Sequence, residues 1–197
     1  MGTTGVVVLA LLAVLVFWAV GAYNRLVRLK NAVSNAFGQI DVQLKRRYDL
    51  IPNLVEVARK YLAHEAQTLE AVIAARNHAR SAEQSAAAGP LSAAGLGALA
   101  SAEQALGGAL GRLFAVAEAY PDLKADQTMR ELSEEIASTE NRVGFSRQAY
   151  NDHVLAFNDA SAQFPALIVA RLFAFQAMPM LEATQSEQER QPVKVAF

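Results

Sequence analysis

The feature that most constrains this chain is an uncharged, apolar stretch at its beginning. No Asp, Glu, Lys or Arg occurs between Met1 and Asn24, and residues 5–23 are almost wholly apolar. A helix over residues 5–23 rises about 28 Å, which matches the hydrocarbon core of a bilayer. The stretch therefore predicts one transmembrane helix, within an N-terminal anchor of residues 1–24.

A cleaved signal peptide is the competing interpretation of this stretch. Such peptides combine a basic first region with a shorter apolar run of about 7–15 residues. Residues 1–4 carry no basic side chain, although Ala19-Val20-Gly21 resembles a cleavage site. The chain has no cysteine, which excludes a lipid-modified cysteine after such a site. We therefore expect an uncleaved anchor.

The charges beside the anchor predict its orientation. Arg25, Arg28 and Lys30 follow the apolar stretch directly, and no basic side chain precedes it. Short flanks rich in Lys and Arg stay in the cytoplasm. We expect a single-pass protein of the cell membrane, with the bulk of the chain on the cytoplasmic side.

Apolar residues after the anchor recur every three to four positions, which is typical of helices that bury one face. The first such stripe predicts one long helix with a bend at Pro52, because proline removes the amide that would bond the Tyr48 carbonyl. Asp49 is a candidate cap at that bend. The stripe comprises Leu26, Leu29, Val33, Phe37, Ile40, Leu44, Tyr48, Ile51, Val55, Ala58, Leu62, Leu69, Val72 and Arg76.

Two further helices are predicted in the remainder of the bundle. A turn around residues 86–92 contains Gly89-Pro90, and a second helix follows it until Pro121. The third helix starts at Asp126, or at Thr128 with Glu131 as a capping box, and Pro165 stops it. Its stripe comprises Met129, Leu132, Ile136, Thr139, Val143, Ser146, Tyr150, Val154, Phe157, Ser161 and Phe164.

The chain ends in an apolar segment and a polar tail. Residues 166–181 are too few to cross a bilayer comfortably, so we expect a helix packed on the bundle. Residues 185–197 are expected to be an extended tail. The predicted organisation is an anchor of residues 1–24, a helical bundle of residues 25–165 and a C-terminal segment of residues 166–197.

Several stretches of the chain resemble the LemA family of bacterial membrane proteins. The longest is QIDVQLKRRYDLIPNLV over residues 39–55, and AEAYPDLKA follows at residues 117–125. Shorter ones are Tyr23-Asn24 with Leu26-Val27, TENR at residues 139–142, Tyr150-Asn151, Phe157-Asn158 and Phe164-Pro165. Phe37 stands where the family often has tryptophan.

The resemblance implies an all-α fold, with one N-terminal transmembrane helix followed by an antiparallel bundle of long helices. It also implies the bacterial inner membrane as the location. It brings no established enzymatic activity and no cofactor. The periodicity of the sequence predicts the same class of fold.

Lys45, Arg46 and Arg47 form the sharpest charge cluster. Lys45 can pair with Asp41 and Asp49 one helical turn away, whereas Arg46 and Arg47 have no acid at that spacing. Such arginines suit bidentate contacts with acidic groups of a partner. Two alternatives are a solvated helix face and internal pairing with acids of the third helix, namely Glu134, Glu135 or Glu140.

The other polar candidates have structural interpretations. Asp49 and Pro52 mark a kink that presents Asn53 or simply bends the helix. Asn141, Asn151 and Asn158 are expected to form hydrogen bonds between helices. The three histidines, His64, His78 and His153, lie far apart with no metal-ligand spacing. We therefore expect no catalytic or metal site, although Asp41, Asp49 and Glu56 form an unplaced acidic group.

Together these features predict a membrane-anchored scaffold or adaptor that acts through helix–helix contacts and is not an enzyme. The partners considered are the bilayer, an unknown protein and a second copy of the chain. The net charge of −1 gives no attraction for nucleic acid. The alternatives are an accessory subunit of an envelope enzyme or membrane protease system, and a signal-transmitting membrane protein.

Overall fold

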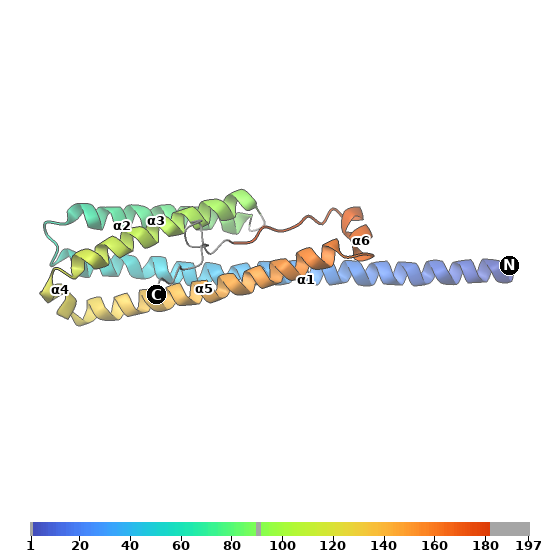
Figure 1. The fold of residues 1–197 in the computed structure, drawn as a ribbon, viewed down its shortest axis with the longest axis horizontal. Helices are drawn as coiled ribbons and strands as arrows, with labels where there is room; N and C mark the ends of the chain where they lie inside the picture. The colour runs from blue at the N-terminus through green and yellow to red at the C-terminus, as the bar shows by residue number, and fades with distance from the viewer. Residues whose placement is uncertain (1, 90–91, 182–197) are drawn as a thin grey trace, which may run out of the picture.

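The computed structural model describes residues 2–89 and 92–181, and these residues form six helices and no strand (Figure 1). The all-α prediction is therefore confirmed. Four long helices, α1, α2, α3 and α5, lie side by side along one axis (Figure 1). The helices are α1 (Thr3–Arg59), α2 (Ala66–Ala88), α3 (Ala93–Ala117), α4 (Pro121–Ala125), α5 (Gln127–Ala162) and α6 (Ala166–Leu172).

Helix α1 is the longest of the described helices. Its 57 residues correspond to a length of about 86 Å. The second half packs on α5 and α2, and the first part extends beyond the bundle with its apolar side chains exposed (Figure 1). Within the described part of the chain, α1 alone is long and apolar enough to cross a membrane. The expected boundary between residues 24 and 25 lies inside this unbroken helix.

The predicted apolar stripes form most of the core. Phe37 and Tyr48 of α1 are buried, and the ring of Phe37 lies edge-on to that of Tyr150 in α5 with centroids 6.0 Å apart. Phe157 and Val154 of α5 are also fully buried. Two residues of the predicted stripe of α5 are not in the core. Phe164, beyond the end of α5, is 81 % exposed, and Leu132 is only partly buried.

The first predicted helix is too long. Instead of continuing to Arg76, α1 ends at Arg59, and the chain reverses before α2 begins at Ala66. The reversal contains no glycine or proline, and Leu62 within it is buried. Leu62 falls at the three-to-four spacing of the stripe. The apolar pattern of the sequence therefore continues through the reversal without interruption.

The other boundaries follow local chemistry. The break at Gly89 is confirmed, and Ser92 caps α3 by accepting a 3.4 Å hydrogen bond from the Gly95 amide. Asp126 caps α5 by accepting a bond from the Met129 amide at 2.9 Å. Asp126 was one of the two predicted starts, and the Thr128 capping box is not used. Pro121 begins the short helix α4 after α3 has ended.

The C-terminal segment is only partly helical. The helix expected over residues 166–181 ends at Leu172, and residues 173–181 run back along the bundle without regular structure (Figure 1). The expectation of one packed helix is thus wrong for the second half. The predicted extended tail, residues 185–197, lies outside the described residues.

Candidate functional site: buried charges at the centre of the bundle

The cluster Lys45, Arg46 and Arg47 spreads over three different neighbours. Lys45 Nζ lies 2.6 Å from Asp41 Oδ2 and 3.7 Å from Glu83 Oε1 of α2. Arg46 Nη2 lies 2.5 Å from Glu135 Oε1 of α5. Arg47 forms an ion pair with Glu103 of α3.

Arg46 and Arg47 both have acidic partners within the bundle. Neither arginine has an acid one turn away on α1, as the spacing indicated, yet both find one on another helix. Glu135 was among the acids considered for internal pairing, and Glu103 was not. The contacts therefore favour internal pairing of Arg46 and Arg47, and above all of Arg47, which is only 4 % exposed.

Arg47 and Glu103 form the most buried ion pair of the described residues. Tyr48 donates a hydrogen bond from its hydroxyl to the same Glu103 carboxylate. Burial raises the pKa of Tyr48, so this hydroxyl keeps its proton and remains a donor. A buried ion pair adds little net stability compared with apolar packing, but losing one member is costly. The group therefore joins α3 to α1 through side chains in the interior of the bundle.

A second buried acid, Glu83, lies beside Asp41 and Lys45. Glu83 is 1 % exposed, and burial together with the Asp41 carboxyl group raises its pKa to about 7. Burial also acts on Asp41, but hydrogen bonds with Glu83 and Lys45 outweigh it and lower the pKa of Asp41. The arrangement is typical of two carboxyl groups that share one proton near neutral pH.

Sequence reasoning did not identify Glu83 and Glu103, although a signal for both was present. They are the only charged residues between 81 and 111, and each lies in a Ser-Ala-Glu-Gln tetrapeptide, at 81–84 and 101–104. Isolated charges in an alanine-rich, apolar stretch need partners if that stretch is buried. The partners come from Lys45 and Arg47, two residues apart on α1.

Pro52 does not divide α1. The Tyr48 carbonyl, which has no amide partner at Pro52, accepts a 3.0 Å hydrogen bond from Arg76 Nε of α2. Arg76 also donates from Nη1 to Asn77 Oδ1 at 3.1 Å. The prediction that the helix continues through Pro52 is confirmed. The predicted cap does not form, because Asp49 is exposed inside a helix that never restarts.

Two of the three highlighted asparagines bind the C-terminal segment. Asn158 exchanges two hydrogen bonds with the backbone of Met178, at 2.9 and 2.8 Å, and Asn151 does the same with Leu181. Tyr150 adds a bond from its hydroxyl to the Pro179 carbonyl at 3.0 Å. The expected bonds thus join a helix to a non-helical segment. Asn141 is exposed.

The spacing of the two asparagines explains this fit. Seven residues of helix separate them, a rise of about 10.5 Å, and three residues of extended chain cover about 10 Å. Each side-chain amide therefore donates one hydrogen bond to the extended backbone and accepts one from it, as a neighbouring β-strand would. This contact, rather than helix propensity, sets the path of residues 178–181.

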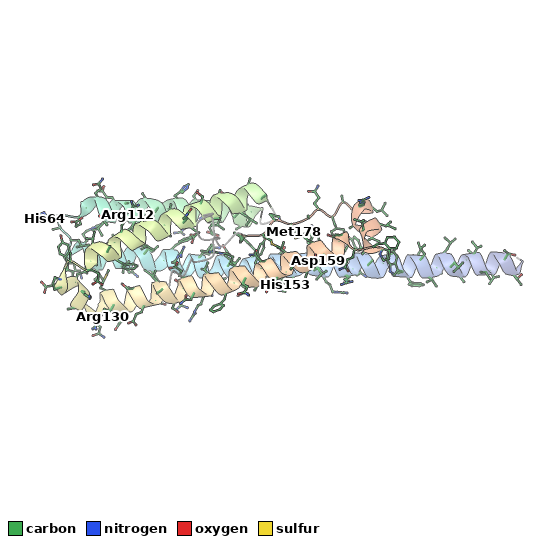
Figure 2. The ribbon with its side chains drawn as sticks, viewed as in Figure 1. His64, Arg112, Arg130, His153, Asp159 and Met178 are labelled. Atoms are coloured by element: carbon green, nitrogen blue, oxygen red, sulfur yellow. The ribbon has the colours of Figure 1, made fainter. Side chains whose placement is uncertain are left out.

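The remaining candidates are not brought together. Asp49 and Glu56 are exposed on α1 and do not join Asp41. In the described ranges, no three His, Asp or Glu residues are placed to hold a metal ion. His64 lies at one end of the bundle and His153 on α5 (Figure 2). The arrangement joins α2 and α3 to α1 through buried charged side chains.

A comparison with protein-family models matches residues 36–197 of the chain to the LemA family. The chain belongs to the LemA family. The buried charges and both asparagine contacts lie inside the matched region, and the apolar part of α1 lies before it. This assignment confirms the family that the motifs indicated.

Curated relatives include the magnetosome proteins MamQ. The chain is 24 % identical to MamQ of Magnetospirillum gryphiswaldense over 172 residues, covering 78 % of this chain and 62 % of the relative. It is 25 % identical to MamQ 2 of Paramagnetospirillum magneticum over 189 residues, covering 86 % of this chain and 68 % of the relative. The chain thus spans about two thirds of the length of these relatives.

Proposed function

We propose that this LemA-family protein is a membrane-anchored scaffold or adaptor that acts through protein contacts rather than catalysis. One observation carries the proposal: a single helix, α1, contains both the apolar segment and the part on which α5 and α2 pack. A continuous helix transmits its orientation without a hinge. From Asn24 to Arg59 it extends about 54 Å, so the bundle projects from the bilayer surface as a rigid support.

Exposed apolar side chains on this support suit a protein partner. Phe145 of α5 is 74 % exposed, and Val42 of α1 is 55 % exposed. Both lie in the stretch of the α1–α5 pair between the Phe37–Tyr150 contact and the Arg46–Glu135 ion pair. Exposed aromatic side chains of this kind are common at protein interfaces.

The edge of the basic cluster borders the same stretch. Lys45 and Arg46 hold Asp41 and Glu135, yet more than half of each side chain is exposed, at 56 % and 52 %. They are therefore able to contact acidic groups of a partner, as the sequence suggested. Arg47 is buried against Glu103 and is therefore not part of this exposed surface.

The membrane part of the proposal follows from the flanking charges. Arg25, Arg28 and Lys30 are exposed directly after the apolar segment. We propose the inner membrane as the location, with the bundle on the cytoplasmic side, because Lys- and Arg-rich flanks remain cytoplasmic. An active alkaline phosphatase fused after Phe197 would contradict this orientation.

Crosslinking in native membranes tests the scaffold. The full chain is crosslinked in membranes as wild type, as Phe145→Ser and as Leu155→Ser, which alters an exposed apolar residue ten positions further along α5. We expect discrete complexes of higher mass, including any homo-oligomer, that are lost in Phe145→Ser and retained in Leu155→Ser. Absence of specific complexes in the wild type, or equal loss in both variants, would contradict the proposal.

A signal-transmitting role is the second candidate. It is favoured by Glu83, a buried acid with a pKa of about 7 next to Asp41 of the membrane-connected helix. Protonation of Glu83 alters the charge at the α1–α2 contact. This candidate requires crosslinked complexes that change between about pH 6 and pH 8, where such a group titrates.

A further inference from the structure

Exposed apolar side chains gather at the point where α6 meets α1. Four large apolar residues within ten positions are exposed: Phe164 at 81 %, Ile168 at 58 %, Leu172 at 77 % and Phe173 at 54 %. We call these four residues the collar. Ile168 and Leu172 are four positions apart in α6, which places them along one side, while Val169 and Ala170 of the same helix are buried; Phe164 lies in the turn just before α6. The side chains of Ile168 and Leu172 on this side of α6 are therefore mostly exposed.

The collar is attached to the end of the apolar segment of α1. Val169 and Ala170 pack with Leu26, and Ala19 and Ala22 border the same cluster. The ring of Phe173 lies against that of Tyr23, with centroids 4.7 Å apart. In Figure 1, α6 lies where α1 leaves the bundle.

This attachment sets the depth of the collar. If residues 5–23 cross a bilayer, Ala19 lies one helical turn inside the end of that segment, about 6 Å along the axis. Helices that lie in the membrane interface bury their apolar side about 5–10 Å. Trp18 and Tyr23, the amphipathic aromatics preferred at this level, flank the contact.

Charge and shape around the collar fit a lipid surface. The basic residues Arg25, Arg28, Lys30 and Arg171 are exposed around the same junction, where they can meet anionic headgroups. A cleft between α1 and the turn that joins α5 to α6 is lined by residues that include Trp18, Arg25 and Phe164. Its lining is mostly apolar and includes a cation, a combination that suits a phospholipid.

We propose that the collar inserts into the bilayer interface as a second membrane contact of this protein. The inference rests on the proposed crossing of the bilayer by α1. One anchoring helix leaves rotation about its own axis free, and a collar on one side of α1 restricts that rotation. The bilayer thereby determines which face of the bundle is presented to a partner.

Tryptophan fluorescence of the full chain in vesicles tests the collar. Trp18 is the only tryptophan, so Trp18→Phe gives a silent background. Single tryptophans are then introduced as Phe164→Trp, Ile168→Trp or Leu172→Trp. Phe145→Trp is the matched control, because Phe145 is equally exposed but lies far along α5. Val14→Trp reports the anchor itself.

The vesicles contain phosphatidylcholine and phosphatidylglycerol whose acyl chains carry bromine near the headgroup. For Val14→Trp, which lies about 14 Å from either end of residues 5–23, a second set of vesicles carries bromine near the ends of the acyl chains. We expect each collar tryptophan to lose at least about half of its fluorescence, since a depth of about 5–10 Å brings it to the bromine atoms. Phe145→Trp should keep nearly all of its fluorescence. Circular dichroism checks that each variant is folded.

The outcomes separate the collar from the anchor. If Val14→Trp is quenched but the collar tryptophans behave like Phe145→Trp, the collar inference is wrong and the anchor stands. Collar tryptophans that escape quenching and shift to shorter wavelength would show a second copy of the chain covering the collar, which also overturns the inference. If Val14→Trp is not quenched, the membrane crossing itself fails.

Discussion

Arg76 of α2 donates a hydrogen bond from Nε to the backbone carbonyl of Tyr48 in α1, at 3.0 Å. This is the carbonyl that Pro52 leaves without an intrahelical partner. A side chain from another helix therefore completes the backbone bonding of α1. Because Arg76 supplies the hydrogen bond that Pro52 cannot, α1 continues through Pro52. The same bond holds α2 at a defined register against α1.

The first prediction concerns this bond. Replacing Arg76 by Met removes a charged donor and should lower the free energy of unfolding by about 1.5–3 kcal/mol. Arg80→Met, an exposed residue of the same helix, is the control and should change little. Pro52→Ala restores the amide to α1, so Arg76→Met should cost less in that background. Equal costs in both backgrounds, measured by denaturant unfolding, would contradict the role of Arg76.

The second prediction separates the buried and exposed arginine pairs. Glu103→Gln leaves Arg47 buried without a countercharge and should cost about 3–5 kcal/mol. Glu135→Gln affects a pair whose side chains are 52 % and 39 % exposed, and should cost about 0–1 kcal/mol. Thermal melts of the two variants give the comparison. Similar melts would mean that Arg47 is not held by Glu103.

The third prediction concerns pH. The pKa of Glu83 rises from 4.5 to about 7 on folding, so the folded chain binds more protons between these values. The stability from this group is therefore present at low pH and lost as the pH rises through 7. We expect the Tm of the wild type to fall by several degrees between about pH 5 and pH 8.5, and Glu83→Gln to reduce that fall.

Glu70→Gln is the control for this experiment, because Glu70 is exposed on the same helix. Asp41 acts in a different window: its lowered pKa contributes stability above its ordinary value of 3.8 that is lost in stronger acid. If Glu83→Gln and Glu70→Gln show the same pH dependence as the wild type, Glu83 does not titrate as described.

The fourth prediction concerns the asparagine contacts. Asn158→Ala removes both bonds to Met178 and leaves its buried backbone groups without these partners. Hydrogen exchange at the Met178 amide should accelerate at least about tenfold, since each lost buried bond costs about 1–3 kcal/mol. Asn141→Ala, at an exposed asparagine of the same helix, should leave that amide protected. Unchanged protection in Asn158→Ala would show that other contacts hold the segment.

The fifth prediction tests whether the bundle folds without its anchor. A chain beginning at Arg25 should be helical and melt cooperatively. Leu44→Ala should cost it about 2–5 kcal/mol, because Leu44 is fully buried. Leu132→Ala should cost less than Leu44→Ala, since Leu132 is only partly buried. Losses below about 0.5 kcal/mol at both positions would contradict the core.

The sequence alone determined the class of fold and most of the core. Apolar spacing is a local property of a helix, so it identified the buried faces of α1 and α5 and the apolar segment before them. Local chemistry also placed the break at Gly89 and narrowed the start of α5 to Asp126 or Thr128. The same spacing missed the reversal after Arg59, because Leu62 preserves the phase and no glycine or proline marks the turn.

The tertiary structure alone decided the partners of the polar residues. Nothing near Arg47 in the sequence indicates Glu103, and nothing near Tyr48 indicates Arg76, because a side chain reaches across helices according to their rotation and register. The path of residues 178–181 was decided in the same way, by Asn151 and Asn158 on α5. Helical periodicity reports which face of a helix is buried, whereas the choice of neighbour depends on how several helices dock at once.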